Sequence, residues 1–90
     1  MLALPDAVTQ ASAVACLEAL SKALALETDS DVVLDAGNLT RFDSTALAVL
    51  LDVRRQVLTM GKQFAVKDVP QRLQDLAALY GIAELLPSRA

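Results

Sequence analysis

The stretch that decides the fold is VVLDAGNLTRFDSTALAVLL, residues 32–51. It begins with three apolar residues, which are too few for a helix and are typical of a buried strand. It ends in a nearly unbroken apolar run that follows three small polar residues, Asp43, Ser44 and Thr45. The side chain of Asp43 or Ser44 can accept a hydrogen bond from the free N–H groups at a helix start. A helix is therefore predicted from about Thr45.

This helix is expected to continue to about Met60 and to end at Gly61, because glycine readily adopts the left-handed conformation that closes a helix. One apolar stripe is expected to face a sheet; it consists of Ala46, Val49, Leu50, Val53, Val57 and Met60. Leucines beside that stripe widen the apolar surface beyond what one sheet contact requires; they are Leu47, Leu51 and Leu58. Two interpretations stay open: a well-buried helix of a small protein, or a helix that also packs on a partner.

The remaining sequence contains further segments with the hydrophobic periods of strands and helices. Strands are predicted at residues 2–4, 32–34 and 63–67, and residues 35–42 are predicted to form a loop. Further helices are predicted from a Ser12 cap to about Leu26 and from about Pro70 to Gly81, the second with a buried stripe of Leu73, Leu76, Ala77 and Tyr80. Strands and helices alternate, which implies a parallel or mostly parallel sheet. The fold class is therefore α/β, with a small sheet and helices packed against it, in one domain over residues 1–90.

The composition argues against several classes of function. The chain has no histidine, one cysteine and three widely separated glycines, so a disulfide within the chain, a metal site built on Cys and His, and a phosphate-binding glycine loop are not expected. A net charge of −3 argues against a nucleic-acid partner. There is no apolar run near the ~18 residues that cross a bilayer, and the first residues do not resemble a signal peptide. We expect a cytoplasmic, non-catalytic protein without metal, cofactor or membrane insertion.

Ser44 has a second interpretation besides capping. The positive end of a helix accommodates a phosphate group, so phosphorylation of Ser44 would be tolerated locally. The phosphate would still add up to about two negative charges, which would repel a partner fitted to the neutral hydroxyl. Farther along the same predicted helix, Arg54 and Arg55 form either a solvated face or a contact with an acidic partner surface.

The opening stretch resembles the signature of STAS domains, the fold of the anti-anti-sigma factors. That signature has an apolar strand ending in Asp, a loop, Asp-Ser or Asp-Thr, and then Leu-x-x-Leu-Leu; the matching positions are Asp35, Asp43, Ser44, Leu47, Leu50 and Leu51. The later segment LAALYGIAELLP, residues 76–87, resembles the end of the MlaB-like STAS subunits of Mla phospholipid-transport ABC complexes.

The sequence departs from the STAS pattern in two ways. STAS domains normally begin with a strand before the one predicted at residues 2–4; we expect this domain to lack that strand, which would leave that edge of the sheet less protected. Ala46 stands where anti-anti-sigma factors often have glycine.

The resemblance implies a protein that works by binding. As an MlaB-like subunit it would bind and stabilise an MlaF-like ABC ATPase, reach the membrane permease through that ATPase, and so lie at the inner membrane. As an anti-anti-sigma factor it would instead bind an anti-sigma kinase and be phosphorylated at Ser44. In both cases the resemblance implies that Asp43, Ser44 and Thr45 form the partner-binding region and that Asp35 braces the preceding loop. Ala46 and the segment at residues 76–87 favour the first alternative.

Overall fold

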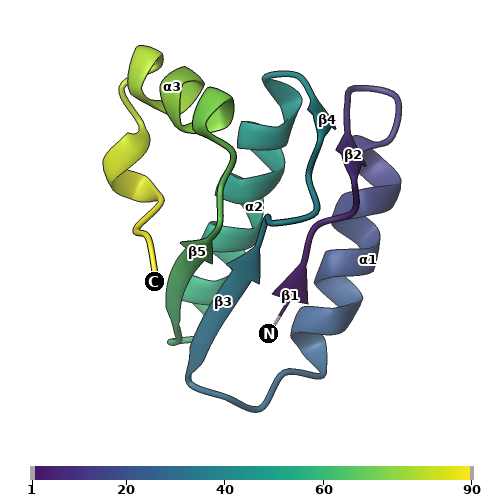
Figure 1. Ribbon diagram of the computed structural model, residues 1–90. Coiled ribbons are helices and arrows are strands. Elements are labelled where there is room, and N and C mark those ends of the chain that lie inside the picture. The colour runs from purple at the N-terminus through teal and green to yellow at the C-terminus, as the bar shows by residue number, and fades with distance from the viewer. Residues whose placement is uncertain (1, 90) are drawn as a thin grey trace.

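The centre of the fold is a parallel sheet of three strands (Figure 1). The computed structural model describes residues 2–89. Strand β3, Asp31–Asp35, lies in the middle of the sheet. Strand β1, Leu2–Ala3, pairs with it over two residues on one side, and β5, Gln63–Lys67, pairs with it over five residues on the other. The predicted parallel α/β arrangement is confirmed.

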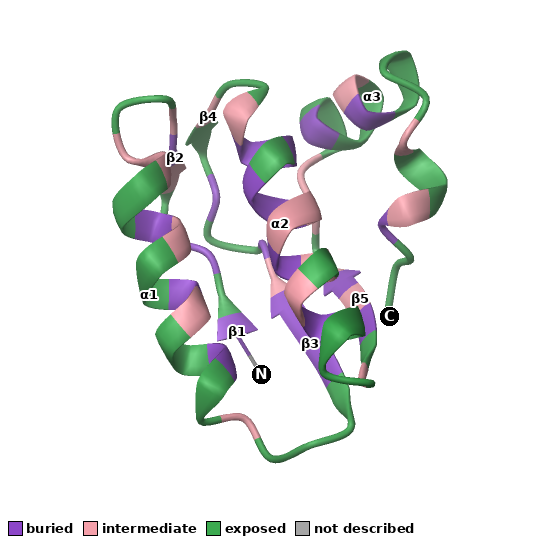
Figure 2. Cartoon of the chain, turned by 180° about the vertical axis from the view of Figure 1, so that it is seen from behind, coloured by how far each residue is buried: buried purple, intermediate pink, exposed green. Residues whose placement is uncertain are grey.

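The helices connect these strands and cover one face of the sheet. Helix α1, Ala13–Ala25, follows the first strands, and α2, Thr45–Thr59, joins the middle of the chain to β5. Figures 1 and 2 show both helices on the same side of the sheet, seen from its two faces. Helix α3, Gln71–Leu79, comes after β5, and the short 3₁₀ helix η1, Ala83–Leu85, leads the chain back along β5. The predicted alternation of strand and helix is therefore present.

A second small sheet lies where a loop was predicted. Strand β2, Ala7–Val8, pairs in parallel with β4, Arg41–Phe42. The backbone carbonyl of Asp6 accepts the N–H groups of Thr40 and Arg41 at 2.8 and 3.0 Å, which holds the two segments together. Two-residue strands carry too few side chains to show a period of two, so the pattern could not indicate them. Their pairing places the entrance of α2 next to the turn that precedes α1.

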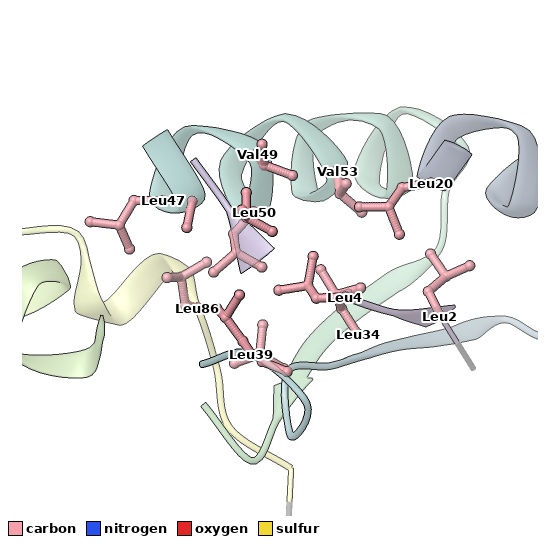
Figure 3. Packing of buried hydrophobic residues seen from close by; sticks show 14 of the residues in the cluster. Leu2, Leu4, Leu20, Leu34, Leu39, Leu47, Val49, Leu50, Val53 and Leu86 are labelled. Atoms are coloured by element: carbon pink, nitrogen blue, oxygen red, sulfur yellow. The ribbon is translucent and has the colours of Figure 1, made fainter. Parts of the chain in front are cut away.

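The predicted stripe of α2 packs on the sheet as expected, with one exception. Figure 3 shows Leu50 and Val53 pointing from the helix toward Leu34 of β3 and Leu4, the residue after β1, and Leu50 is completely buried. Met60, which was also placed on the stripe, is 44% exposed. It follows the last helical residue, where the chain already turns toward Gly61.

Two other predictions are corrected by the structure. Tyr80 does not belong to the buried stripe of α3, because it lies beyond the last helical residue and is 56% exposed; the chain turns at Gly81, whose φ is +73°. Ser12 stands at the start of α1 but makes no side-chain cap. Its hydroxyl oxygen accepts the N–H of Thr9 at 3.1 Å instead, so it closes the preceding turn.

Candidate partner-binding site at the start of α2

Asp43 holds the entrance of α2 through both of its carboxylate oxygens. Oδ1 accepts the backbone N–H of Thr45 at 2.9 Å, and Oδ2 accepts the backbone N–H of Gln10 at 3.1 Å. The pKa of the Asp43 carboxyl is lowered from its ordinary value, first by hydrogen bonding with the Thr45 side chain and then by the backbone N–H groups of Thr45 and Gln10. Asp43 is therefore a carboxylate at neutral pH that ties the start of α2 to the turn before α1.

Ser44 follows Asp43 in the chain, and within residues 2–89 its side chain makes no hydrogen bond. It is exposed and occupies the position before the first helical residue, but its hydroxyl makes no capping hydrogen bond. Its backbone carbonyl accepts the N–H of Leu47 at 3.0 Å and so begins the helix. Of the two side chains that could have capped α2, Asp43 does so. The hydroxyl of Ser44 remains available to another molecule.

An apolar groove of about 140 Å³ lies between α1 and α2, next to this entrance. Its lining consists of Ala13, Val14, Leu17, Thr45, Ala48 and Val49. Val14 is 72% exposed, and Ala48 is exposed as well. Farther along the helix pair, Gln56 Nε2 donates to Ser21 Oγ at 3.0 Å, so a polar contact joins the helices beyond the groove. Thr45, the residue after Ser44, therefore lines the groove together with apolar side chains of both helices.

The predicted arginine pair lies away from this entrance. Arg54 and Arg55 follow Ser44 by roughly 15 Å along the helix axis at 1.5 Å per residue. The Nη2 atom of Arg55 lies 2.8 Å from Asp52 Oδ1, and its side chain is 69% exposed. Arg54 is half-buried. The structure therefore does not bring these two side chains together with Ser44.

Asp35 acts on the loop directly after β3. Its Oδ1 accepts the N–H of Gly37 at 2.8 Å. A Cβ added to Gly37 would lie 3.0 Å from the same oxygen and 3.5 Å from Asp68 Cβ, so this turn leaves little room for a side chain. The hydrogen bond orders the first part of the loop, whereas the end of the loop is held by Asp43.

Arg72 contacts the site from a distant part of the chain. It lies in the first turn of α3, and its guanidinium carbon is 4.8 Å from the centre of the Phe42 ring. Phe42 directly precedes Asp43 and is half-buried. No sequence pattern connects residues 42 and 72, so the contact is visible only in the folded structure.

Other features of the described residues do not add to the site at the start of α2. A hollow of about 300 Å³ lies between β5, α3 and the segment after it, with Val66, Leu73 and Leu86 in its wall, but none of the residues around Ser44 lines it. Within residues 2–89, no three acidic or cysteine side chains are grouped so that they could hold a metal ion. No helix in the same range is both long and apolar enough to cross a membrane.

Comparison with known proteins supports the resemblance found in the sequence. A family model described as "Mlab, STAS domain" matches residues 1–87. Among curated proteins, none matches the chain. The family match includes the entrance of α2, the groove beside it and the 3₁₀ helix η1.

Proposed function

Since the chain belongs to the MlaB-like STAS domain family, we propose that it binds and stabilises the ATPase subunit of an ABC transporter that moves phospholipid between membranes. STAS domains are generally binding modules rather than catalysts, and they typically act through protein–protein contacts. We propose that residues 1–90 work as one such domain.

The observation that carries this proposal is the surface at the start of α2. Ser44, whose hydroxyl makes no capping hydrogen bond, directly precedes Thr45, and Thr45 lines an apolar groove together with the exposed side chain of Val14. Covering apolar surface stabilises a complex, and a neutral hydroxyl can be covered at low cost if the partner offers it a hydrogen bond. A folded partner surface with one polar group beside aliphatic side chains fits this combination.

The proposed partner is an MlaF-like ATPase. The subunit would reach the membrane permease only through this ATPase, and it would lie at the cytoplasmic side of the inner membrane. The resemblance of residues 76–87 to the MlaB-like subunits supports this assignment.

The alternative is an anti-anti-sigma factor that binds an anti-sigma kinase and is phosphorylated at Ser44. The observation in its favour is the exposed, unbonded hydroxyl of Ser44 at a helix start, where a phosphate would be accommodated. Ala46, which replaces a common glycine, is 1% exposed. Its methyl group is buried in the core and does not hinder approach to Ser44, so the preference between the two functions depends on the C-terminal segment.

Binding measurements with Ser44 variants test the proposal. The MlaF-like ATPase from the same organism is titrated with wild type, Ser44→Ala and Ser44→Glu, and circular dichroism confirms that each variant is folded. We expect Ser44→Ala to bind, and Ser44→Glu to lose affinity by about tenfold or more because an unpaired charge would be desolvated in the interface. Folded Ser44→Glu that binds as tightly as wild type would place Ser44 outside the interface. Phosphoserine at position 44 after incubation with an anti-sigma kinase and ATP would favour the alternative.

A further inference from the structure

Arg72 occupies a position that its own helix disfavours. It is the second residue of α3, and the first turn of a helix carries a partial positive charge that repels cations. No acidic residue lies in that first turn to compensate. A residue that violates a local preference without a local benefit is a candidate for a role in function.

The ring of Phe42 compensates in part and fixes where the guanidinium lies. The guanidinium carbon stands 4.8 Å from the ring centre, within the range of an attractive cation–π contact. Phe42 is held in turn, because its strand pairs with β2 so that Phe42 lies opposite Val8, which is fully buried. The aromatic platform is therefore part of the folded framework.

The stacked guanidinium keeps its hydrogen-bonding edge free. Arg72 is exposed, and within residues 2–89 its side chain makes no hydrogen bond or ion pair. The carboxylate of Asp43, which follows Phe42 in the chain, is already committed to the N–H groups of Thr45 and Gln10. The planar guanidinium offers five N–H donors in a geometry that matches both oxygens of a carboxylate.

We propose that Arg72, positioned by Phe42, binds an aspartate or glutamate side chain of the ATPase on the same surface that contains Ser44. This inference rests on the proposed function and adds the chemistry of the partner surface. The partner would place a carboxylate opposite Arg72 and uncharged side chains opposite Ser44 and the groove. The ion pair would orient the ATPase on the domain, because a bidentate contact fixes direction as well as distance.

The test measures affinity for the purified MlaF-like ATPase by calorimetry at about 50 and about 300 mM salt, two ionic strengths that differ strongly in screening. The proteins are wild type, Arg72→Ala, Arg72→Lys and Phe42→Leu. Arg89→Ala is the matched control, because it also removes one exposed arginine but lies beside Asp31, at the opposite end of β3. Thermal melts establish that each variant is folded.

We expect Arg72→Ala to weaken binding by about tenfold or more, as when a charge-assisted interface contact is lost. It should also reduce the salt dependence of the affinity, which a purely structural role would leave unchanged. Arg72→Lys should bind with intermediate affinity, because it keeps the charge but loses the planar fork, and Phe42→Leu should weaken binding less than Arg72→Ala. Arg89→Ala should bind as wild type does.

Two outcomes distinguish failure of this inference from failure of the proposed function. If wild type binds the ATPase and Arg72→Ala binds within twofold of it, the role of Arg72 is overturned while the proposed function stands. If wild type does not bind the ATPase, both are overturned. Arg72→Lys with the affinity of wild type would overturn the bidentate contact.

Discussion

At the scale of single residues, the structure assigns the capping of α2 to Asp43 and leaves the hydroxyl of Ser44 free, a choice that the sequence leaves open. Either side chain could cap α2, and the sequence cannot decide between them. The backbone of Ser44 is already close to helical, with φ −61° and ψ −16°. A capping side chain needs a non-helical backbone to turn back toward the first free N–H groups. Asp43 precedes that helical geometry, so its carboxylate reaches Thr45, and the Ser44 hydroxyl stays free.

This assignment predicts different results for two alanine substitutions. Asp43→Ala removes both side-chain contacts of the entrance, so its melting temperature should fall by several degrees. Ser44→Ala removes no hydrogen bond, so its free energy of unfolding should stay within about 0.5 kcal/mol of wild type. Asp43→Asn should lie between them, because its one amide oxygen can accept the N–H of Thr45 while its NH₂ group cannot accept the N–H of Gln10. Thermal and urea unfolding measure all three, and a larger loss for Ser44→Ala than for Asp43→Ala would contradict the assignment.

At the scale of elements, the hydrophobic period of the sequence correctly identifies α2 and its buried face. It fails for residues that follow the last turn of a helix. Five of the six predicted stripe residues are buried, whereas Met60 is not. Tyr80 fails for the same reason at the end of α3. A hydrophobic period predicts which residues of a regular helix share one face. The residue after the last turn no longer has helical backbone geometry, so its side chain does not lie on that face. The short strands β2 and β4 could not be predicted, because a backbone pairing between distant segments forms them.

The buried face of α2 predicts a strong effect at its centre. Leu50 is completely buried against the sheet, so Leu50→Asp places an unpaired carboxylate in the core. Such burial costs several kcal/mol, comparable with the whole stability of a small domain, so the variant should be unfolded. Arg55→Ala is the control on the same helix: it removes only an exposed ion pair, typically worth about 0–1 kcal/mol. Thermal melts followed by circular dichroism compare the two variants. A cooperative melt of Leu50→Asp near that of wild type would mean that Leu50 is not buried against the sheet.

At the scale of the whole molecule, the sequence predicts the part of the site that is local along the chain. Asp43, Ser44 and Thr45 are consecutive, and their types alone indicate a helix entrance. The groove beside them and the contact of Arg72 with Phe42 join segments that are far apart in sequence. Exposed Val14 looks like any other apolar position of α1 until its neighbours are known. Surfaces that tertiary packing forms from distant segments could therefore be recognised only in the structure.

The unequal pairing of the central strand predicts how the sheet opens. The N–H of Leu4 donates to Asp35 across the short β1–β3 pairing, and the N–H of Ala36 donates to Lys67 across the longer β3–β5 pairing; both hydrogen bonds measure 2.8 Å. Equal length does not imply equal protection, because an amide proton exchanges with solvent through the least costly opening of its surroundings. We expect Leu4 to exchange by local detachment of β1 and Ala36 only when the domain unfolds globally.

Native-state hydrogen exchange, followed residue by residue with NMR, would measure this difference. The Leu4 amide should exchange faster than the Ala36 amide, with an opening free energy that depends little on added denaturant. Equal rates for the two amides would show instead that the three strands open as one unit. A β1 that detaches alone would leave β3 transiently with a free edge while α2 and its entrance keep their form. The sheet would then open only at its β1 edge, and the surface that carries Ser44 would keep its structure while β1 is detached.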